Sequence, residues 1–254
     1  MQHSHMMKTS QSEKYLGDLI SSSLNNKSII ADRKNAGIGF NAQIMSLLND
    51  ISLGSHYFEI AKILREAMLI NGILFNADAW YDLKETDIEC LEKVDESLLR
   101  KVLKAHSKTA IESLYLELGC KPLRFHLKSK RINFLRYILN LDENDLLYRF
   151  FKTQLKFPVK GDWCNTVKDD LKDLDIDLTF DQIKEMKKIP FKKLVRKKAN
   201  EAALKYLNNL KNTHSKLDNL TFNKLQIQPY LNTRTIYPPM AQQIFKWRTR
   251  MAMF

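Results

Sequence analysis

Turn-forming residues are scarce in this sequence, which has only 7 glycines and 6 prolines in 254 residues. A large all-β protein needs many turns, so this scarcity favours an all-α fold. No apolar run approaches the ~20 residues of a membrane span. Residues 1–10 lack the apolar stretch of a secretion signal. We therefore expect a protein of the cytoplasm and nucleus that is not secreted and has no membrane partner.

The residue types that build most metal and catalytic sites are few or unsuitably spaced. Three cysteines, Cys90, Cys120 and Cys164, are too few and too far apart for a disulfide framework or a zinc site. No histidine lies three or four residues from another histidine or a cysteine, and the phosphate-loop, GxSxG and HExxH motifs are absent. We expect no catalytic residue, no metal, no cofactor and no small-molecule substrate.

One pair of adjacent aspartates, Asp169 and Asp170, is of the type that holds metal ions in polymerases. A two-metal polymerase site needs its paired carboxylates on a tight turn between strands. Residues 167–171 instead have the periodicity of a helix. We interpret the pair as part of a solvated helix face.

The excess positive charge is confined to the second half of the chain. Residues 1–120 contain 13 Lys/Arg and 16 Asp/Glu, a net charge of −3, whereas residues 121–254 contain 28 and 13, a net charge of +15. The densest stretch, 184–205, has nine Lys/Arg and two Glu. It is either a solvated helix face or a surface that follows phosphates, because each neutralised phosphate releases counterions.

Apolar residues recur at helical spacing along almost the whole chain. The predicted fold class is an all-α multi-helix bundle in two sub-bundles, with at most one short β-hairpin near residues 14–21. The connector 157–162 contains Pro158 and Gly161 and is predicted to divide the sub-bundles. Gly119 is predicted to end one helix, and Pro190 to open another. The predicted helices span about 28–51, 55–74, 86–104, 109–118, 123–140, 142–155, 163–174, 179–188, 191–212 and a last stretch to residue 254.

Several short segments follow one another in a recognisable order. They are KYLGDLIS at 14–21, RKNAGIG at 33–39, LREAMLING at 64–72, AWY at 79–81, LYLELG at 114–119 and the basic pair at 130–131. This ordered set resembles the C-terminal part of the polymerase polyprotein of non-LTR retrotransposons, the LINE-like and jockey-like elements. The resemblance covers nearly the whole chain.

The resemblance implies the thumb and post-thumb region of a reverse transcriptase. The aspartate-bearing palm motifs of the family precede the segment that resembles 14–21, and its zinc knuckle lies further downstream, so neither has a counterpart here. The implied units are a palm–thumb junction at 1–26, a thumb-like helical bundle at 27–156 and a basic post-thumb region at 157–254. The implied function is non-catalytic nucleic-acid binding, not enzyme activity. The implied partners are RNA or an RNA–DNA duplex and a palm-bearing reverse transcriptase chain.

The first group of candidate nucleic-acid-binding residues lies in the first predicted helix. It consists of Arg33, Lys34, Gly37 and Gly39. The two cations would contact phosphates without reading sequence. Each mid-helix glycine costs ~1 kcal/mol relative to alanine, and close approach to a sugar–phosphate backbone would offset that cost. Close packing against another helix would account for the glycines equally well.

The other candidates lie in the basic half. One group is Lys128, Lys130 and Arg131, and the other is Lys193, Arg196 and Lys197. The second group is spaced i, i+3, i+4 and is therefore predicted to share one side of a helix, with Lys192 as a rim residue. Trp80 and Tyr81 are expected in the core, with stacking on bases as the alternative.

Two other classes of function remain open at the level of sequence. The first is a helical protein–protein interaction module whose basic face meets an acidic surface, as in a domesticated transposon remnant. The second is a small enzyme, which would require Asp169, Asp170 and a distant glutamate around one cavity.

Overall fold

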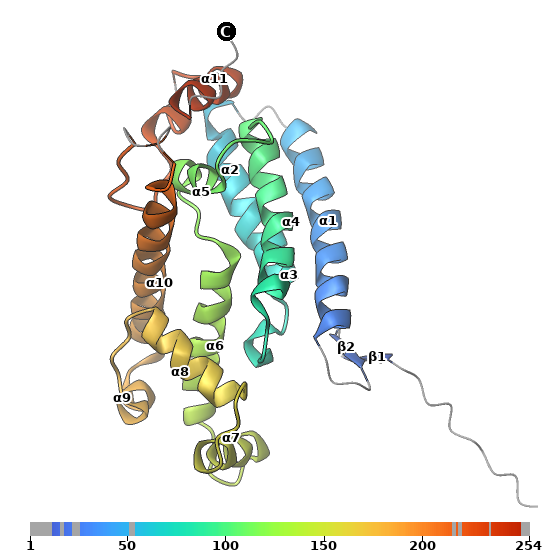
Figure 1. Cartoon of the computed structure of the whole chain (residues 1–254), viewed down its shortest axis with the longest axis vertical. Coiled ribbons are helices and arrows are strands. Elements are labelled where there is room, and N and C mark those ends of the chain that lie inside the picture. Colours follow the sequence, from blue (N-terminus) through green and yellow to red (C-terminus); the bar gives the residue numbers. More distant parts are fainter. Residues whose placement is uncertain are drawn as a thin grey trace, which may run out of the picture.

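The computed structural model describes residues 12–15, 18–21, 26–50, 54–214, 217, 220–233 and 235–249. Within these ranges the chain is an all-α bundle with one two-stranded antiparallel hairpin, which confirms the predicted fold class (Figure 1). The hairpin consists of β1 (Ser12–Tyr15) and β2 (Asp18–Ser21). Ser12 lies opposite Ser21, and Tyr15 lies opposite Asp18.

The helices follow the predicted order, with shifted ends. The first part of the chain forms α1 (Lys27–Asp50), η1 (Gly54–His56), α2 (Tyr57–Leu64), η2 (Arg65–Ile70), α3 (Asn71–Ile73), η3 (Ala77–Ala79), α4 (Glu85–Leu103) and α5 (Ile111–Leu118). The second part forms α6 (Leu123–Leu139), α7 (Leu146–Lys156), α8 (Trp163–Asp173), α9 (Phe180–Glu185), α10 (Lys188–Lys211), η5 (Pro229–Leu231) and α11 (Pro238–Arg248).

Two helix starts differ from the prediction for local reasons. Helix α7 begins four residues later than predicted, because Asp145 caps it, and the Asp145 carboxylate accepts the Leu147 N–H at 2.8 Å. Helix α10 begins at Lys188, so Pro190 is its third residue rather than its first. The first four N–H groups of a helix have no partner within the helix, so a proline is tolerated there.

The first hydrophobic core lies between α1, the helical rod of α2, η2 and α3, and helices α4 and α5. Helix α1 runs beside α4 (Figure 1). A Cβ atom at Gly37 would lie 2.9 Å from the Ile73 side chain and 3.0 Å from Val94. Gly37 is therefore explained by close helix packing, and not by a nucleic-acid backbone.

The second core is formed by α6, α7, α8, α9 and the first half of α10. Phe151 and Trp163, on either side of the connector 157–162, both lie in it. The predicted dividing point is therefore inside one core. Helix α6 links the two cores instead, because Leu127 belongs to the first core and Ile132 to the second.

The end of the chain returns to the first core. Gly119, which has φ +60° and ends α5 as predicted, lies so close to Gln226 that a Cβ atom there would overlap the Gln226 backbone. Buried Glu117 accepts hydrogen bonds from Tyr230 at 3.0 Å and from Arg248 at 2.9 Å. Within the described residues α11 ends at Arg248, and residues 250–254 of the predicted last helix lie outside them.

Candidate nucleic-acid interface

A basic groove lies between α6 and the first half of α10, and η3 contributes to its wall. Its volume is about 550 Å³. Five cationic side chains line it, whereas Asp78 is the one carboxylate among the described residues that do so. The cations are Lys121, Lys130, Lys188, Lys192 and Arg196. Two aromatic rings, Phe134 and Tyr137, complete the α6 wall.

Helical spacing explains why these residues meet. Lys188, Lys192 and Arg196 repeat every four residues and so lie along one side of α10. That side is next to the stripe Phe191, Val195 and Ala199, which is buried in the second core. The α6 wall follows the same rule, since its lining residues fall at 129, 130, 133, 134 and 137.

Polar contacts fix both walls of the groove. The Arg136 guanidinium donates to the Met186 carbonyl oxygen at 2.9 and 2.6 Å, which ties α6 to the segment just before α10. Lys130 Nζ donates to the Leu74 carbonyl oxygen at 2.9 Å, and Lys121 Nζ lies 3.5 Å from Asn200 Oδ1. Lys130 and Lys121 are therefore held in place, which reduces the entropy that they lose when a ligand binds.

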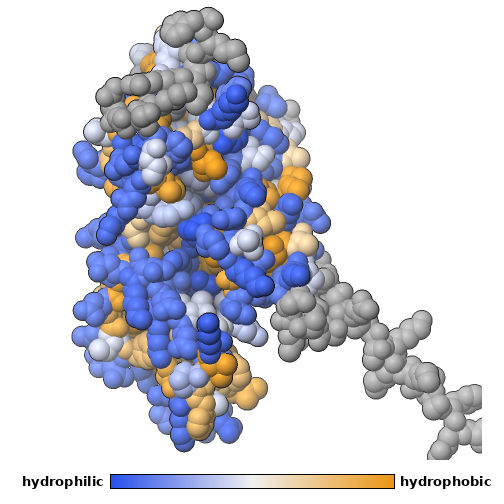
Figure 2. All heavy atoms as spheres, in the orientation of Figure 1, coloured by the Kyte–Doolittle hydropathy of each residue, from blue (hydrophilic) through white to orange (hydrophobic). Residues whose placement is uncertain are grey.

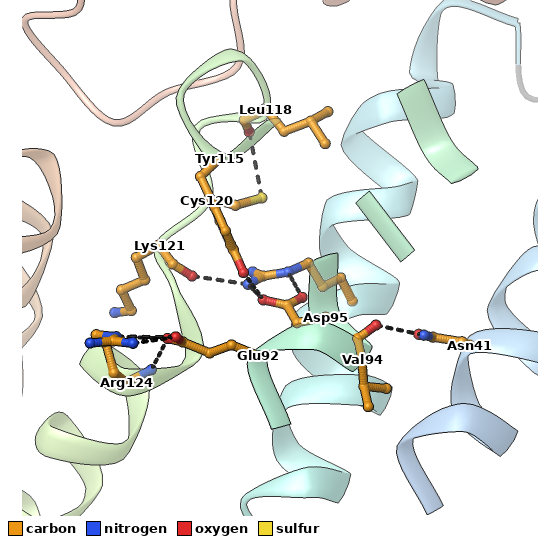
Figure 3. Close-up of polar contacts among 10 residues, drawn as sticks. Asn41, Glu92, Val94, Asp95, Tyr115, Leu118, Cys120, Lys121 and Arg124 are labelled. Carbon is orange, nitrogen blue, oxygen red and sulfur yellow. Dashed lines mark hydrogen bonds and ion pairs between the residues drawn. The ribbon is translucent and has the colours of Figure 1, made fainter. Parts of the chain in front are cut away.

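A buried ion pair positions the start of α6 (Figure 3). Arg65 from the π-helical η2 contacts both carboxylate oxygens of Asp95, at 2.6 and 2.5 Å. The Tyr115 hydroxyl donates to the same carboxylate at 3.0 Å, and Arg65 also donates to the Lys121 carbonyl oxygen at 2.9 Å. Since both charges are almost fully buried, they are tolerable only with these partners. The network thereby sets the position of Lys121 at one end of the groove.

The surroundings disfavour the charged form of two groove lysines. Burial, together with the charges of Arg65, Arg196 and Lys62, lowers the pKa of Lys121 to about 8 against the opposing effect of Glu66. Burial also lowers the pKa of Lys130, against the effect of Asp78. A lysine gives up its proton this easily only where cations outnumber nearby anions or water is excluded. A bound anion would relieve both penalties.

The structure brings only some of the predicted residues into the groove. Lys130 and Arg196 line it, whereas Lys193 and Lys197 do not. Lys197 is exposed and lies 3.8 Å from Glu201. Lys192, predicted as a rim residue, lies in the groove beside Arg196. The side of α10 that faces the groove is therefore that of Lys192 and Arg196, and not the predicted side. The apolar stripe of Phe191, Val195 and Ala199 is the sequence signal that could have identified this side of α10, because the groove cations lie next to it.

Two predicted residues of α6 are engaged by acids of α8. Arg131 is 4% exposed and contacts Asp170 at 2.6 and 2.9 Å, so it is a structural residue and not a phosphate ligand. The interpretation of Asp170 as solvated is therefore wrong, although Asp169 is exposed as expected. Lys128 is paired with Asp173.

The candidates on α1 do not join the groove. Helices α1 and α10 lie on opposite sides of the molecule (Figure 1). Arg33 is buried, with its guanidinium carbon 5.2 Å from the centre of the Phe75 ring. Lys34 and Gly39 are exposed, and a Cβ at Gly39 would have no neighbour within 4 Å. Sequence reasoning missed Lys121 and Lys188, because their role depends on how α6 and α10 pack.

Nothing in the described part of the chain suggests a metal or thiol site. No group of three or more His, Cys, Asp or Glu residues there could hold a metal ion. Burial raises the pKa of Cys120, and raises that of Cys164 to about 12, so both thiols stay protonated and unreactive. No helix in the same ranges is long and apolar enough to cross a membrane.

The groove thus places five cations beside two aromatic rings. Its lysines and arginine can neutralise and hydrogen-bond phosphate oxygens, and Arg196 can do so with two parallel donors. Comparison with models of protein families, with curated proteins and with solved structures finds no match for this chain.

Proposed function

We propose that this chain is a non-catalytic nucleic-acid-binding module that holds the phosphates of RNA or an RNA–DNA duplex in the groove between α6 and α10. The observation that carries the proposal is the gathering of five cations with one carboxylate in one groove, where burial lowers the pKa of Lys121 and of Lys130. Such a groove favours a polyanion, because each phosphate bound releases counterions and relieves the repulsion among the cations.

Aromatic rings in the same groove favour nucleic acid over other polyanions. Phe134 and Tyr137 stack with ring centres 5.8 Å apart and planes 13° apart. Tyr137 is 56% exposed, so its ring is available to a base. Base-on-ring stacking is tolerant of sequence, which suits a module that holds a strand by its backbone.

The resemblance to non-LTR retrotransposon polymerases supports a specific setting for this activity. In that setting the chain would act as the thumb and post-thumb part of a reverse transcriptase. A palm-bearing chain would then supply the catalytic aspartates. The groove residues on α10 belong to the basic region implied by the resemblance.

A helical protein–protein interaction module is the second candidate. The exposed apolar side chains around α7, among them Leu146 and Phe150, favour it. This module would bind an acidic protein at the basic face more tightly than it binds RNA. The two functions therefore differ in which ligand displaces the other.

Helix α10 offers a matched pair of variants for the test. Lys192→Ala/Arg196→Ala removes two cations that line the groove, whereas Lys193→Ala/Lys197→Ala removes two that do not. Both pairs come from the same helix and lower the net charge equally. Binding of a labelled RNA and an RNA–DNA duplex is measured by fluorescence anisotropy over a range of salt concentrations.

We expect the groove pair to weaken binding and to lower the salt slope by about two units, one for each phosphate that is no longer neutralised. The outer pair, Lys193→Ala/Lys197→Ala, should leave the salt slope close to that of the wild type. Equal losses of affinity in both double variants would show that charge alone attracts the ligand and would exclude the groove as the site. Displacement of RNA by an acidic peptide at similar concentration would favour the interaction module instead.

A further inference from the structure

A second hollow adjoins the basic groove and has the opposite character. Its volume is about 320 Å³, and apolar and aromatic side chains from α6, α7 and the connector after α7 dominate its walls. The rings that line it are Tyr81, Phe134, Phe150, Phe151 and Trp163. The lower end of the molecule in Figure 2, where α7 lies, shows the corresponding apolar surface.

The two depressions share a wall. Phe134 lines both of them, and consecutive residues of η3, Asp78 and Ala79, line the groove and the hollow respectively. A nucleotide whose phosphate contacts the groove cations therefore has the hollow within reach of its base. Tyr137, stacked on Phe134, stands on the groove side of this shared wall.

The walls of the hollow are rigid, and part of them is open to solvent. The Trp163 indole meets Phe134 edge to face, with ring centres 5.7 Å apart, and its N–H donates to the Asp78 carbonyl oxygen at 2.8 Å. In contrast, Phe150 is 59% exposed and Tyr81 is 48% exposed. Aromatic rings left open beside a preformed apolar surface are available for a flat ligand, at little cost in ordering.

We propose that the hollow receives an unpaired nucleobase from the strand whose phosphates lie in the groove. This inference rests on the proposed function and narrows it, because a base in a duplex cannot leave its partner without losing pairing and stacking. The half-buried Gln154 on the same wall carries an amide that can both donate to and accept from a base edge.

The cations of the adjoining groove favour an anionic ligand for the hollow over a neutral one. Two carboxylates line the hollow, Asp82 and Asp162. The Asp162 carboxylate accepts the Asn165 N–H at 2.6 Å and the Val159 N–H at 2.9 Å, so it is engaged by the backbone, whereas Asp82 is exposed. Lys160 adds a cation on the same side. The groove beside the hollow contributes five more. An anionic ligand with a flat apolar part fits this pairing of surfaces.

The test compares a single-stranded RNA with the RNA–DNA duplex of the same sequence. Phe150→Ala and Tyr81→Ala each remove an exposed ring from the hollow, so the fold should tolerate them. Leu146→Ala is the matched control, because Leu146 is an 80% exposed apolar residue of the same helix α7 that does not line the hollow. Thermal melting checks that all three variants are folded.

We expect the wild type to prefer the single strand, and each ring removal to weaken single-strand binding by ~10-fold or more. The salt slope should not change, since the cations that neutralise the phosphates are all retained. Duplex binding should be unaffected, and Leu146→Ala should bind like the wild type.

Two results would overturn the inference. If Phe150→Ala and Tyr81→Ala bind the single strand within twofold of the wild type while Lys192→Ala/Arg196→Ala weakens it, the base site is wrong and the proposed function stands. Equal affinity of the wild type for the single strand and the duplex would likewise show that the base site is wrong, while the proposed function stands. If Lys192→Ala/Arg196→Ala weakens nucleic-acid binding no more than Lys193→Ala/Lys197→Ala does, the proposed function itself fails.

Discussion

Lys121 should make anion binding in the groove dependent on pH. Burial and neighbouring cations lower its pKa to about 8, so the free protein loses this charge as the pH rises through that value. A phosphate about 4 Å away would stabilise the ammonium by about 4 kcal/mol at an effective dielectric constant of about 20. This energy corresponds to about three pKa units. Bound Lys121 should therefore stay protonated to beyond about pH 10.

The sign of the effect follows from proton linkage. At pH values below the pKa of Lys121 in the free protein, Lys121 is charged in both the free and the anion-bound protein, and the affinity does not depend on its titration. Above it, binding must take up a proton, and each further pH unit costs about tenfold in affinity. The affinity should thus fall about tenfold between about pH 7 and about pH 9. Lys130, whose pKa is also lowered, contributes in the same direction.

The measurement is fluorescence anisotropy with a labelled DNA oligonucleotide, which withstands alkaline pH, at constant ionic strength. Calorimetry in two buffers of different ionisation enthalpy counts the protons taken up. Lys121→Met keeps most of the aliphatic bulk and removes the charge, so its affinity should be lower at neutral pH and change much less with pH. Lys193→Met, outside the groove, should retain the full dependence. An equally steep fall in Lys121→Met and the wild type would refute the reasoning.

Two further predictions concern the scaffold that positions the groove. Asp95→Asn leaves the buried Arg65 charge uncompensated and should lower the free energy of unfolding by about 3–5 kcal/mol in urea denaturation, whereas Arg65→Met/Asp95→Leu should cost less, because no unpaired charge remains. Gly37→Ala should destabilise the protein by ~1–3 kcal/mol, since its Cβ would lie 2.9 Å from Ile73. Gly39→Ala, in open space on the same helix, should stabilise it by up to ~1 kcal/mol. Equal effects of the two alanine substitutions would contradict the packing explanation for Gly37.

The elements of the fold could be predicted because their signals are local. Helical periodicity identified the helices, and a glycine at the end of α5 was predicted to stop it and does so in the left-handed conformation. Helix ends were less accurate where the capping residue lies inside the predicted range, as Asp145 does before α7. The division into cores was not predictable from the connector 157–162, because a turn-forming segment does not reveal what packs on either side of it.

The candidate site was only partly predictable, because the partner of a cation is not a local property. Arg131 and Asp170 are 39 residues apart in sequence, and Arg65 and Asp95 are 30 apart. Consecutive residues on a helix point about 100° apart, so neighbouring cations meet different surroundings. Lys130 lines the groove while Arg131 is buried against α8. Sequence alone identified the cations as a group but not which of them are free to bind.

The acids of α8 and of the turn after it explain why one face carries the binding potential. They pair with cations of α6 and α10 on the side that they cover. These pairs are Lys128 with Asp173, Arg131 with Asp170, and Lys198 with Asp175. On the groove side of the same two helices, Asp78 is the one carboxylate among the described lining residues, so the five cations there keep a net positive charge. The position of the site is therefore decided less by how many cations the chain has than by where its acids are placed.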